Sequence, residues 1–169
     1  MTSDPALRVT VVCSGNICRS PIGEVVLRDA VERAGLSHAV TVDSAGIGAW
    51  HVGEGADRRA VSALGRHGYD GSHHRVQQIT RDWFDDDSTA PDLLLAMDGG
   101  HYEALRRLAP GTDVRMVRSF DPMLSGLERD EVDLDVPDPY YGDAEGFEEV
   151  LEMVEAATPG IVAHLRSLL

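Results

Sequence analysis

Residues 7–21 read LRVTVVCSGNICRSP, and the fold class is most clearly indicated by this segment. Its first part, Leu7–Val12, is a short apolar run rich in β-branched residues, which predicts a buried strand that ends at Cys13. Ser-Gly-Asn follows as a loop, and Pro21 then stands at the predicted first position of a helix that stops at Gly35. The stretch is therefore predicted to form a strand, a short loop and a helix N-terminus.

The rest of the chain continues this alternation. Further strands are predicted from short apolar runs at Ala39–Val42, Leu93–Met97 and Val114–Val117. Helices are predicted from apolar residues at helical spacing, over Ala56–His67, from Gly99 through Leu108, and over Ala144–Leu169 with a kink or restart at Thr158-Pro159. Loops are expected at Asp85–Thr89 and from Ser125 to Gly142. Strands that alternate with helices predict an α/β fold with a parallel sheet covered on both faces.

The composition fits a globular protein. The chain has 169 residues, 43% of them hydrophobic and 26% charged, which is enough for one domain, residues 1–169, with its own core. No uncharged apolar run approaches the ~20 residues of a membrane span. The first ten residues carry no basic region followed by an apolar stretch, so no secretory signal is expected. A cytoplasmic protein is expected, and export without a signal peptide stays open.

The charge balance makes two classes of partner unfavourable. Fifteen basic residues, all of them Arg, stand against 29 acidic ones, for a net charge of −14. A field of this sign repels nucleic acid and anionic membrane, so neither is expected as a partner. Acidic residues concentrate between Glu128 and Glu155, and most of them are expected to form a solvated face.

The loop between Cys13 and Arg19 has the composition of a phosphate cradle. Gly15 and Asn16 tolerate backbone angles that point consecutive N–H groups inward. Together with the positive end of the helix, these groups form a site for a tetrahedral dianion, and Arg19 can hold two phosphoryl oxygens at once. The same dipoles stabilise the thiolate of Cys13, which favours nucleophilic attack on phosphorus. The alternative is a buried, inert cysteine at the end of a strand.

Cleavage of a phosphate ester also needs a proton donor, because neither a thiolate nor a guanidinium can protonate the leaving oxygen. Asp138 is the best candidate among many carboxylates. It stands between Pro137 and Pro139, on a stiffened loop, and Tyr140 and Tyr141 follow it directly. Its acidic neighbours remain alternatives on the residues alone.

The segment CSGNICRSP at residues 13–21 resembles the signature of the low-molecular-weight protein tyrosine phosphatases, and DPYY at 138–141 resembles their second motif. WHVG at 50–53 and DPYYGD at 138–143 are similar to the actinobacterial branch of the family. The resemblance covers essentially the whole chain. It implies a three-layer α/β fold, with a four-stranded parallel sheet flanked by helices, and a metal-free phosphatase without a cofactor.

The resemblance also implies the reaction. The enzyme would be a monomeric signalling phosphatase that hydrolyses phosphotyrosine in proteins, and small aryl phosphates, through a cysteinyl-phosphate intermediate. Inorganic phosphate or vanadate would inhibit it. Cys13 would be the nucleophile, Arg19 the phosphate ligand and Asp138 the general acid, with a hydrogen bond from the Ser20 hydroxyl to the Cys13 sulfur.

Further residues have implied supporting roles. Phosphate binding and loop support fall to Ser14, Gly15, Asn16, Ile17, Cys18, Ser20, Ser44 and His74. The walls of the substrate slot would be Ile17, Trp50, Tyr140 and Tyr141. Cys18 could form a reversible disulfide with Cys13 under oxidant, or simply pack in the loop. The sequence departs from the family pattern at Ile47, where this branch often carries Thr, and at Gln77, where relatives often carry Arg.

Three other functions are alternatives to a tyrosine phosphatase. An arsenate reductase of the same fold needs further cysteines to carry a disulfide away, and the chain has none beyond Cys18. A protein-arginine phosphatase carries a smaller residue in place of Ile17 and no aromatic pair after the acid. A non-catalytic phosphotyrosine-binding module would need no nucleophile or acid, and both are present here.

Overall fold

The computed structural model describes residues 6–124 and 133–169. Four strands form one parallel sheet in the order β2-β1-β3-β4. Their bounds are β1 Leu7–Cys13, β2 Val40–Gly46, β3 Leu93–Ala96 and β4 Asp113–Met116. Because β1 is a central strand, the loop that follows it opens at the middle of the sheet edge, where ligands bind in folds of this kind.

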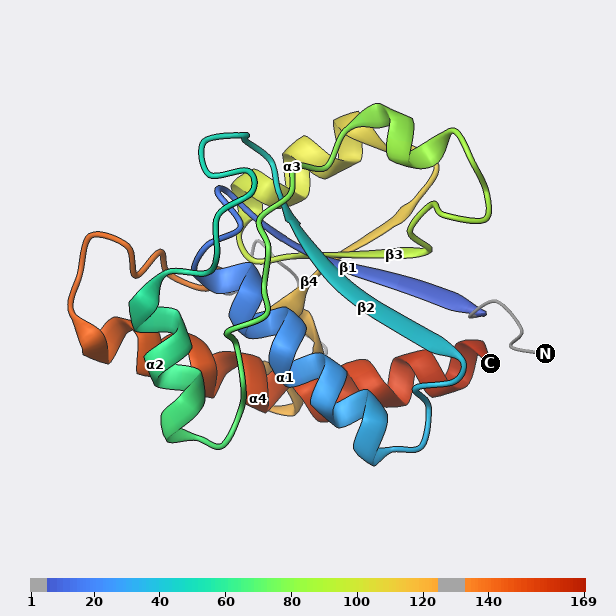
Figure 1. Cartoon of the computed structure of the whole chain (residues 1–169). Coiled ribbons are helices and arrows are strands. Elements are labelled where there is room, and N and C mark those ends of the chain that lie inside the picture. Colours follow the sequence, from blue (N-terminus) through green and yellow to red (C-terminus); the bar gives the residue numbers. More distant parts are fainter. Residues whose placement is uncertain (1–5, 125–132) are drawn as a thin grey trace.

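Helices cover both faces of the sheet, which gives three layers (Figure 1). Helix α3 (Gly99–Leu108) lies on one face. The other face carries α1 (Arg19–Arg33), α2 (Arg58–Arg66) and α4 (Ala144–Leu168), and α4 packs along α1. Three short 3₁₀ turns complete the described elements: Arg81–Phe84, Val117–Phe120 and Pro122–Leu124. The predicted fold class is confirmed.

The strands are apolar on both sides because both faces are covered. Val9 and Val11 of β1 point into the cluster shared with α1 and α4, whereas Val12 points into the cluster shared with α3. Leu93 and Leu94 of β3 divide in the same way, and all five side chains are at most 1% exposed. A strand buried on two faces is expected to be continuously hydrophobic, as these are.

Strand β2 extends further than predicted. The sequence indicated a strand over Ala39–Val42, but β2 continues to Gly46. Within the added part, the Asp43 carboxylate accepts a hydrogen bond from the Thr10 hydroxyl of β1 at 2.6 Å. That partner allows a polar side chain inside the sheet.

The prediction for Pro21 was wrong, and one of the two alternatives predicted for Pro159 was wrong. Helix α1 begins at Arg19, so Pro21 is its third residue; the first N–H groups of a helix have no intrahelical acceptor, so the missing donor costs little there. Helix α4 does not restart at Pro159, because it runs as one helix to Leu168, and the alternative of a kink at Thr158-Pro159 stays a prediction. Next to the missing backbone bond, the Thr158 hydroxyl donates to the Val154 carbonyl at 2.7 Å.

Other element bounds differ by a residue or two. Helix α2 is shorter than the predicted Ala56–His67 because the Asp57 side chain accepts from the Arg59 N–H and caps it. Strands β3 and β4 each end one residue early. Of the predicted loop from Ser125 to Gly142, residues 125–132 lie outside the described part, and residues 133–142 contain no helix or strand.

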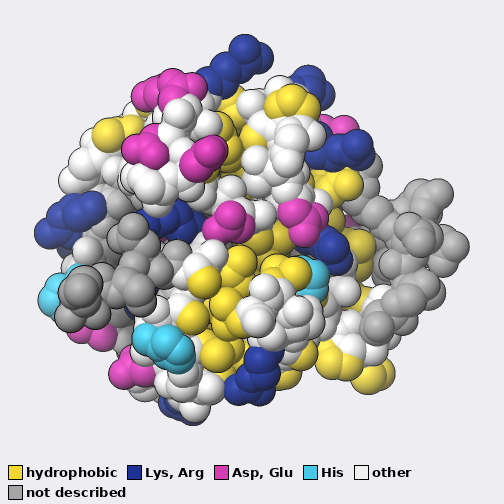
Figure 2. Space-filling view, turned by 90° about the vertical axis from the view of Figure 1, so that its right-hand side faces the viewer, with side chains coloured by type: hydrophobic (Ala, Val, Ile, Leu, Met, Phe, Trp, Pro, Cys, Tyr) yellow, Lys and Arg dark blue, Asp and Glu magenta, His cyan; other side chains and the backbone are white. Residues whose placement is uncertain are grey.

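On the face shown in Figure 2, arginine and carboxylate side chains are interspersed around hydrophobic ones. The excess acid therefore does not make this face a field of one sign. Within the described ranges, no helix has the length and apolarity needed to cross a membrane.

Candidate active site

The site is built on the loop that joins β1 to α1, which we call the phosphate loop (residues 13–19). Asn16 at its centre has a φ of 60°, in the left-handed region that Asn adopts more readily than most residues. The end of β2 approaches the loop closely: a Cβ on Gly46 would lie 2.9 Å from the Ser14 carbonyl oxygen. Glycine at this position therefore lets the two segments pack against each other.

A buried hydrogen-bond network holds Asn16. Its amide nitrogen donates to the Ser20 hydroxyl at 2.7 Å and to the Ser44 hydroxyl at 2.9 Å. The Ser44 hydroxyl donates in turn to the Glu24 carboxylate at 3.0 Å, and His74 Nε2 donates to the Asn16 carbonyl at 2.8 Å. The structure thus joins Asn16, Ser20, Ser44 and His74, which the sequence analysis grouped as loop support.

One hydrogen bond connects this network to the Cys13 sulfur. Ser20 Oγ lies 2.9 Å from Cys13 Sγ, and either atom could donate. When Cys13 is a thiolate, its sulfur has no proton, so Ser20 is then the donor. A hydroxyl that donates to sulfur favours the thiolate form.

Glu24 was not predicted as a site residue, and Gln77 was predicted only to depart from the family pattern. Burial raises the pKa of Glu24, but the hydrogen bond from His74 and the charge of Arg28 outweigh it, so the pKa lies below its usual value. Gln77 supports the loop: its N–H donates to Asn16 Oδ1 at 3.0 Å, and its side chain donates to the Ser44 carbonyl at 2.9 Å.

Hydrogen bonds on the side away from the pocket orient the Arg19 guanidinium. Its Nη1 donates to the Asp98 carboxylate at 2.8 Å and to the Val136 carbonyl at 2.9 Å, and the residue is only 3% exposed. Its Nη2 lies 3.8 Å from an oxygen of Asp138. One edge of the guanidinium is thereby held, and the rest is left for an anion.

Asp98 and His101 form a second support that the sequence analysis missed. Asp98 caps α3, and burial, which raises its pKa, is outweighed by hydrogen bonds from the His101 N–H and from Arg19, so that its pKa is lowered. His101 Nδ1 accepts from the Asp98 N–H, which leaves Nε2 to donate to the Ser14 hydroxyl at 2.9 Å. Burial lowers the pKa of His101 to about 4, so the ring is neutral near pH 7. The sequence could have indicated Asp98 by its position, because it follows the carboxyl end of β3 and ligands bind beyond such strand ends.

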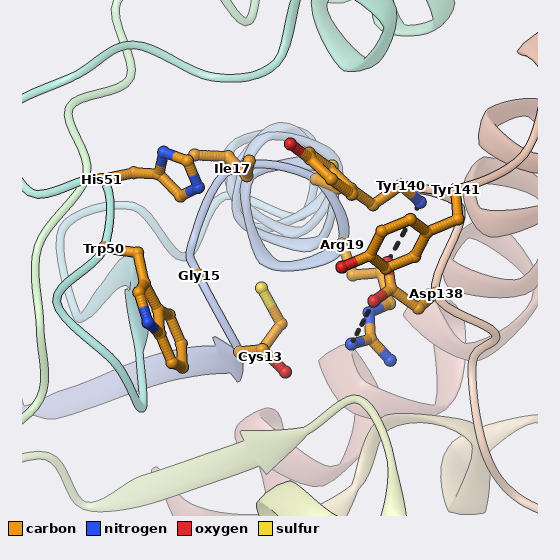
Figure 3. Close-up of a pocket in the computed structure, with 11 residues that line it drawn as sticks. Cys13, Gly15, Ile17, Arg19, Trp50, His51, Asp138, Tyr140 and Tyr141 are labelled. Carbon is orange, nitrogen blue, oxygen red and sulfur yellow. Dashed lines mark hydrogen bonds and ion pairs between the residues drawn. The ribbon is translucent and has the colours of Figure 1, made fainter.

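Asp138 faces the Cys13 sulfur from the opposite side of the pocket (Figure 3). Its side chain is 44% exposed, and one oxygen accepts from the Tyr140 N–H at 3.1 Å. The residue lies on the acid segment (residues 136–142), which precedes α4. Val136 anchors the start of this segment, because its N–H donates to the Met97 carbonyl at 2.8 Å.

The pocket above the sulfur has a volume of about 530 Å³. Trp50 and His51 stand on one side of it, and Tyr140 and Tyr141 on the other (Figure 3). The two tyrosine rings meet edge to face, with centroids 4.9 Å apart. All the residues predicted to wall the substrate slot line this pocket, which is bounded by Cys13, Ser14, Gly15, Ile17, Cys18, Arg19, Trp50, His51, Asp138, Tyr140 and Tyr141. His51, paired with Glu54, was not predicted as a wall residue.

The two cysteines are free thiols, both buried. Burial, followed by the charge of Asp57, raises the pKa of Cys18 to about 12, so Cys18 is a protonated thiol at neutral pH.

The arrangement suits transfer of a phosphoryl group. The Cys13 sulfur, an oriented guanidinium and a carboxyl group border one cavity with aromatic walls. Within the described residues, no three His, Cys, Asp or Glu side chains gather in a way that could hold a metal ion.

Comparison with known proteins agrees with this chemistry. Residues 8–168 match the family model for low molecular weight phosphotyrosine protein phosphatase. A low molecular weight protein-tyrosine-phosphatase of Streptomyces coelicolor is 53% identical over 163 residues, covering 94% of this chain and 93% of its own.

Solved structures are similar too. A protein tyrosine phosphatase from Entamoeba histolytica, with Hepes in its active site, superposes with a TM-score of 0.82 at 27% identity, covering 95% of this chain and 97% of its own. Wzb of Vibrio vulnificus, in complex with benzylphosphonate, gives 0.73 at 31% identity, covering 94% and 98%. With a match of this extent over a site of this geometry, the chain belongs to the low-molecular-weight phosphotyrosine protein phosphatase family.

Proposed function

We propose that this chain, as a single domain of residues 1–169, hydrolyses phosphotyrosine in proteins and small aryl phosphates through a cysteinyl-phosphate intermediate. The observation that carries the proposal is the convergence of Cys13, Arg19 and Asp138 on one cavity of about 530 Å³. The Wzb relative, which was solved with benzylphosphonate, supports an aryl substrate of this kind.

In the first step, the Cys13 thiolate attacks phosphorus and forms the S–P bond as the bond between phosphorus and the tyrosine oxygen breaks. Asp138 gives its proton to that oxygen, so that tyrosine leaves as a neutral phenol. Arg19 and the N–H groups of the phosphate loop bind the equatorial oxygens, where charge accumulates in the transition state.

In the second step, water attacks the phosphorus of the intermediate. Asp138, now a carboxylate, takes a proton from that water, and the S–P bond breaks to release phosphate and regenerate the Cys13 thiolate. The hydrogen bond from Ser20 at 2.9 Å stabilises the sulfur both as nucleophile and as leaving group.

Selection for phosphotyrosine is assigned to the pocket walls. Ile17 and Trp50 on one side, and Tyr140 and Tyr141 on the other, leave a slot suited to a flat ring. A phosphoserine side chain is too short to fill such a slot while its phosphate reaches the sulfur. Ile17 and the tyrosine pair also disfavour phosphoarginine as the substrate.

We also propose that the protein acts as a monomer, works in the cytoplasm as a signalling phosphatase, and is inhibited by inorganic phosphate and vanadate. Inhibition is expected because both anions offer oxygens to Arg19 and to the phosphate loop.

The test is the Cys13→Ser variant with a phosphotyrosine peptide. Turnover should vanish while binding of inorganic phosphate, measured by calorimetry, is retained, and wild-type turnover should survive a metal chelator. Full activity in the Cys13→Ser variant, or complete loss of wild-type activity with the chelator alone, would contradict the proposal. Faster release of phosphate from phosphoarginine than from phosphotyrosine would instead favour the arginine phosphatase.

A further inference from the structure

An arginine that does not line the pocket connects the phosphate loop side of the site to the acid segment. Arg59, in the first turn of α2, directs its guanidinium at Asp57, the residue that caps the helix. Its Nε and Nη2 donate to the two carboxylate oxygens at 3.1 and 3.0 Å. This is the paired geometry in which Arg holds a carboxylate most firmly.

The same guanidinium also binds the acid segment. Nη2 donates to the Tyr140 carbonyl at 3.0 Å, and Nη1 donates to the Gly142 carbonyl at 3.2 Å. Its central carbon lies 4.6 Å from the centre of the Phe147 ring, a cation–π distance. Phe147 is fully buried at the start of α4, so the guanidinium rests on a fixed surface.

Asp57 is tied to the phosphate loop. Its N–H donates to the Ile17 carbonyl at 2.8 Å, and the Cys18 thiol is hydrogen bonded to its carboxylate. Burial raises the pKa of Asp57, but the hydrogen bonds from Arg59 outweigh it and keep the pKa below its usual value. The pair is therefore charged at neutral pH.

The position of Asp138 depends on its neighbours. Its side chain is half-exposed, with one hydrogen bond from the Tyr140 N–H and Arg19 at 3.8 Å. Val136 anchors the segment upstream, through Met97 and Arg19. The two carbonyls bound by Arg59 lie downstream, so Asp138 is held between the two anchors.

We propose that Arg59 is a positioning residue for proton transfer: it joins Asp57 on the phosphate loop side to the carbonyls of Tyr140 and Gly142, and so fixes the carboxyl group of Asp138 relative to the Cys13 sulfur. This inference rests on the proposed function, because it needs Asp138 as the proton donor. A displacement of about 1 Å at a reacting group can cost on the order of 100-fold in rate.

The test replaces Arg59 by Met, which keeps an apolar stem over Phe147 and removes the charge and its hydrogen bonds. We expect kcat/KM to fall about 10- to 100-fold for phenyl phosphate, whose leaving group needs a proton, and less than about 3-fold for p-nitrophenyl phosphate. The inhibition constant of inorganic vanadate should stay within about 2-fold, because the phosphate loop is intact. An equal loss on both esters would overturn the inference.

Arg66 provides the matched control. It lies on the same helix and binds Glu148 of α4 through its Nε at 2.7 Å, so it also ties α2 to α4. Arg66→Met also removes one positive charge from α2, but Arg66 does not contact the acid segment. This variant should therefore lower kcat/KM for both esters equally or not at all. A selective loss in this variant would show that general loosening of α2 explains the effect, and would overturn the inference.

A double-variant cycle separates this inference from the proposed function. With Asp138→Asn already present, Arg59→Met should add no further selective loss, because both act on one step. Additive selective losses would overturn the positioning role. If Asp138→Asn alone keeps the wild-type preference between the two esters, the proposed proton donor is wrong instead. If Arg59→Met does not fold, Arg59→Lys replaces it. This variant should lower kcat/KM for phenyl phosphate more than for p-nitrophenyl phosphate, by less than the loss expected for Arg59→Met. An equal loss on both esters in Arg59→Lys would overturn the inference.

Discussion

The Ser20 hydroxyl and the Cys13 sulfur lie 2.9 Å apart in a buried contact, and the Asn16 amide, which donates to the same hydroxyl, holds Ser20 in place. The contact stabilises negative charge on sulfur, which exists before attack and again when the intermediate breaks down. Ser20 thus serves both steps of the proposed reaction.

For Ser20→Ala we expect slower breakdown of the intermediate, because sulfur becomes a poorer leaving group. One hydrogen bond to a charged group is worth about 1.5–3 kcal/mol, which corresponds to about 10- to 150-fold in rate. Rapid mixing with p-nitrophenyl phosphate should show a burst of nitrophenol larger than that of the wild type. An unchanged burst and unchanged kcat would contradict this role.

For Asp138→Asn we expect a loss that depends on the leaving group. Tyrosine, with a pKa near ~10, leaves poorly as an anion, so its phosphate ester should lose about 10²–10⁴-fold in rate. Nitrophenyl phosphate should lose much less. Asp133→Asn is the control, because this neighbouring carboxylate does not line the pocket. The acid is misassigned if the control, and not Asp138→Asn, changes the leaving-group dependence.

For Trp50→Ala we expect KM for phosphotyrosine peptides to rise more than kcat falls, because a wall binds the ground state and the transition state alike. Trp50 is 73% exposed, so the free energy of unfolding should hardly change. Val52→Ala is the matched control, since Val52 lies on the same loop, is 54% exposed and does not line the pocket. Wild-type kinetics in Trp50→Ala would show that Trp50 does not contact the substrate.

The two cysteines should differ in reactivity. Because burial raises the pKa of Cys18 to about 12, iodoacetamide at pH 7 should label Cys13 and spare Cys18, as peptide mass spectrometry would show. Brief peroxide treatment should inactivate the enzyme, with recovery on addition of a reductant. Poorer recovery in Cys18→Ala would support a protective disulfide; equal recovery would leave Cys18 as a packing residue.

His101 should make stability depend on pH. Its pKa in the folded state is about 4, below the ~6.5 of an unfolded chain, so the unfolded state binds the proton more strongly between these values. Stability should therefore fall as pH drops from 6.5 to 4, by roughly 3 kcal/mol from this group. Urea unfolding of wild type and His101→Asn across this range measures the difference. Parallel pH curves for the two proteins would exclude the effect.

Much of the fold was predictable because its signals are local. The β-branched run of β1, the Gly and Asn of the phosphate loop and the apolar spacing of α4 are each set by neighbours in sequence. The same holds for Cys13 and Arg19, which lie at the two ends of one loop. Their positions in the structure agree with those predictions.

The missed residues depend on contacts between distant parts of the chain. Asp98 orients Arg19 only because β3 pairs with β1, and Arg59 reaches Tyr140 only because α2 and the acid segment meet beside α4. The Asp43 carboxylate stays inside β2 because Thr10 is its register partner. Hydrophobic periodicity does not predict such long-range contacts, because they depend on the order of the strands and on the packing of the helices.

The central place of β1 has a consequence for synthesis of the chain. Cys13, the proposed nucleophile, is synthesised before β3, the Val136 carbonyl that binds Arg19, and Asp138. A nascent chain that has reached only α2 therefore carries the cysteine without the groups that orient phosphate or donate a proton. Because pairing of the chain's distant parts is slow, enzymatic competence should arise late in folding, once β3 and the acid segment have packed beside the phosphate loop.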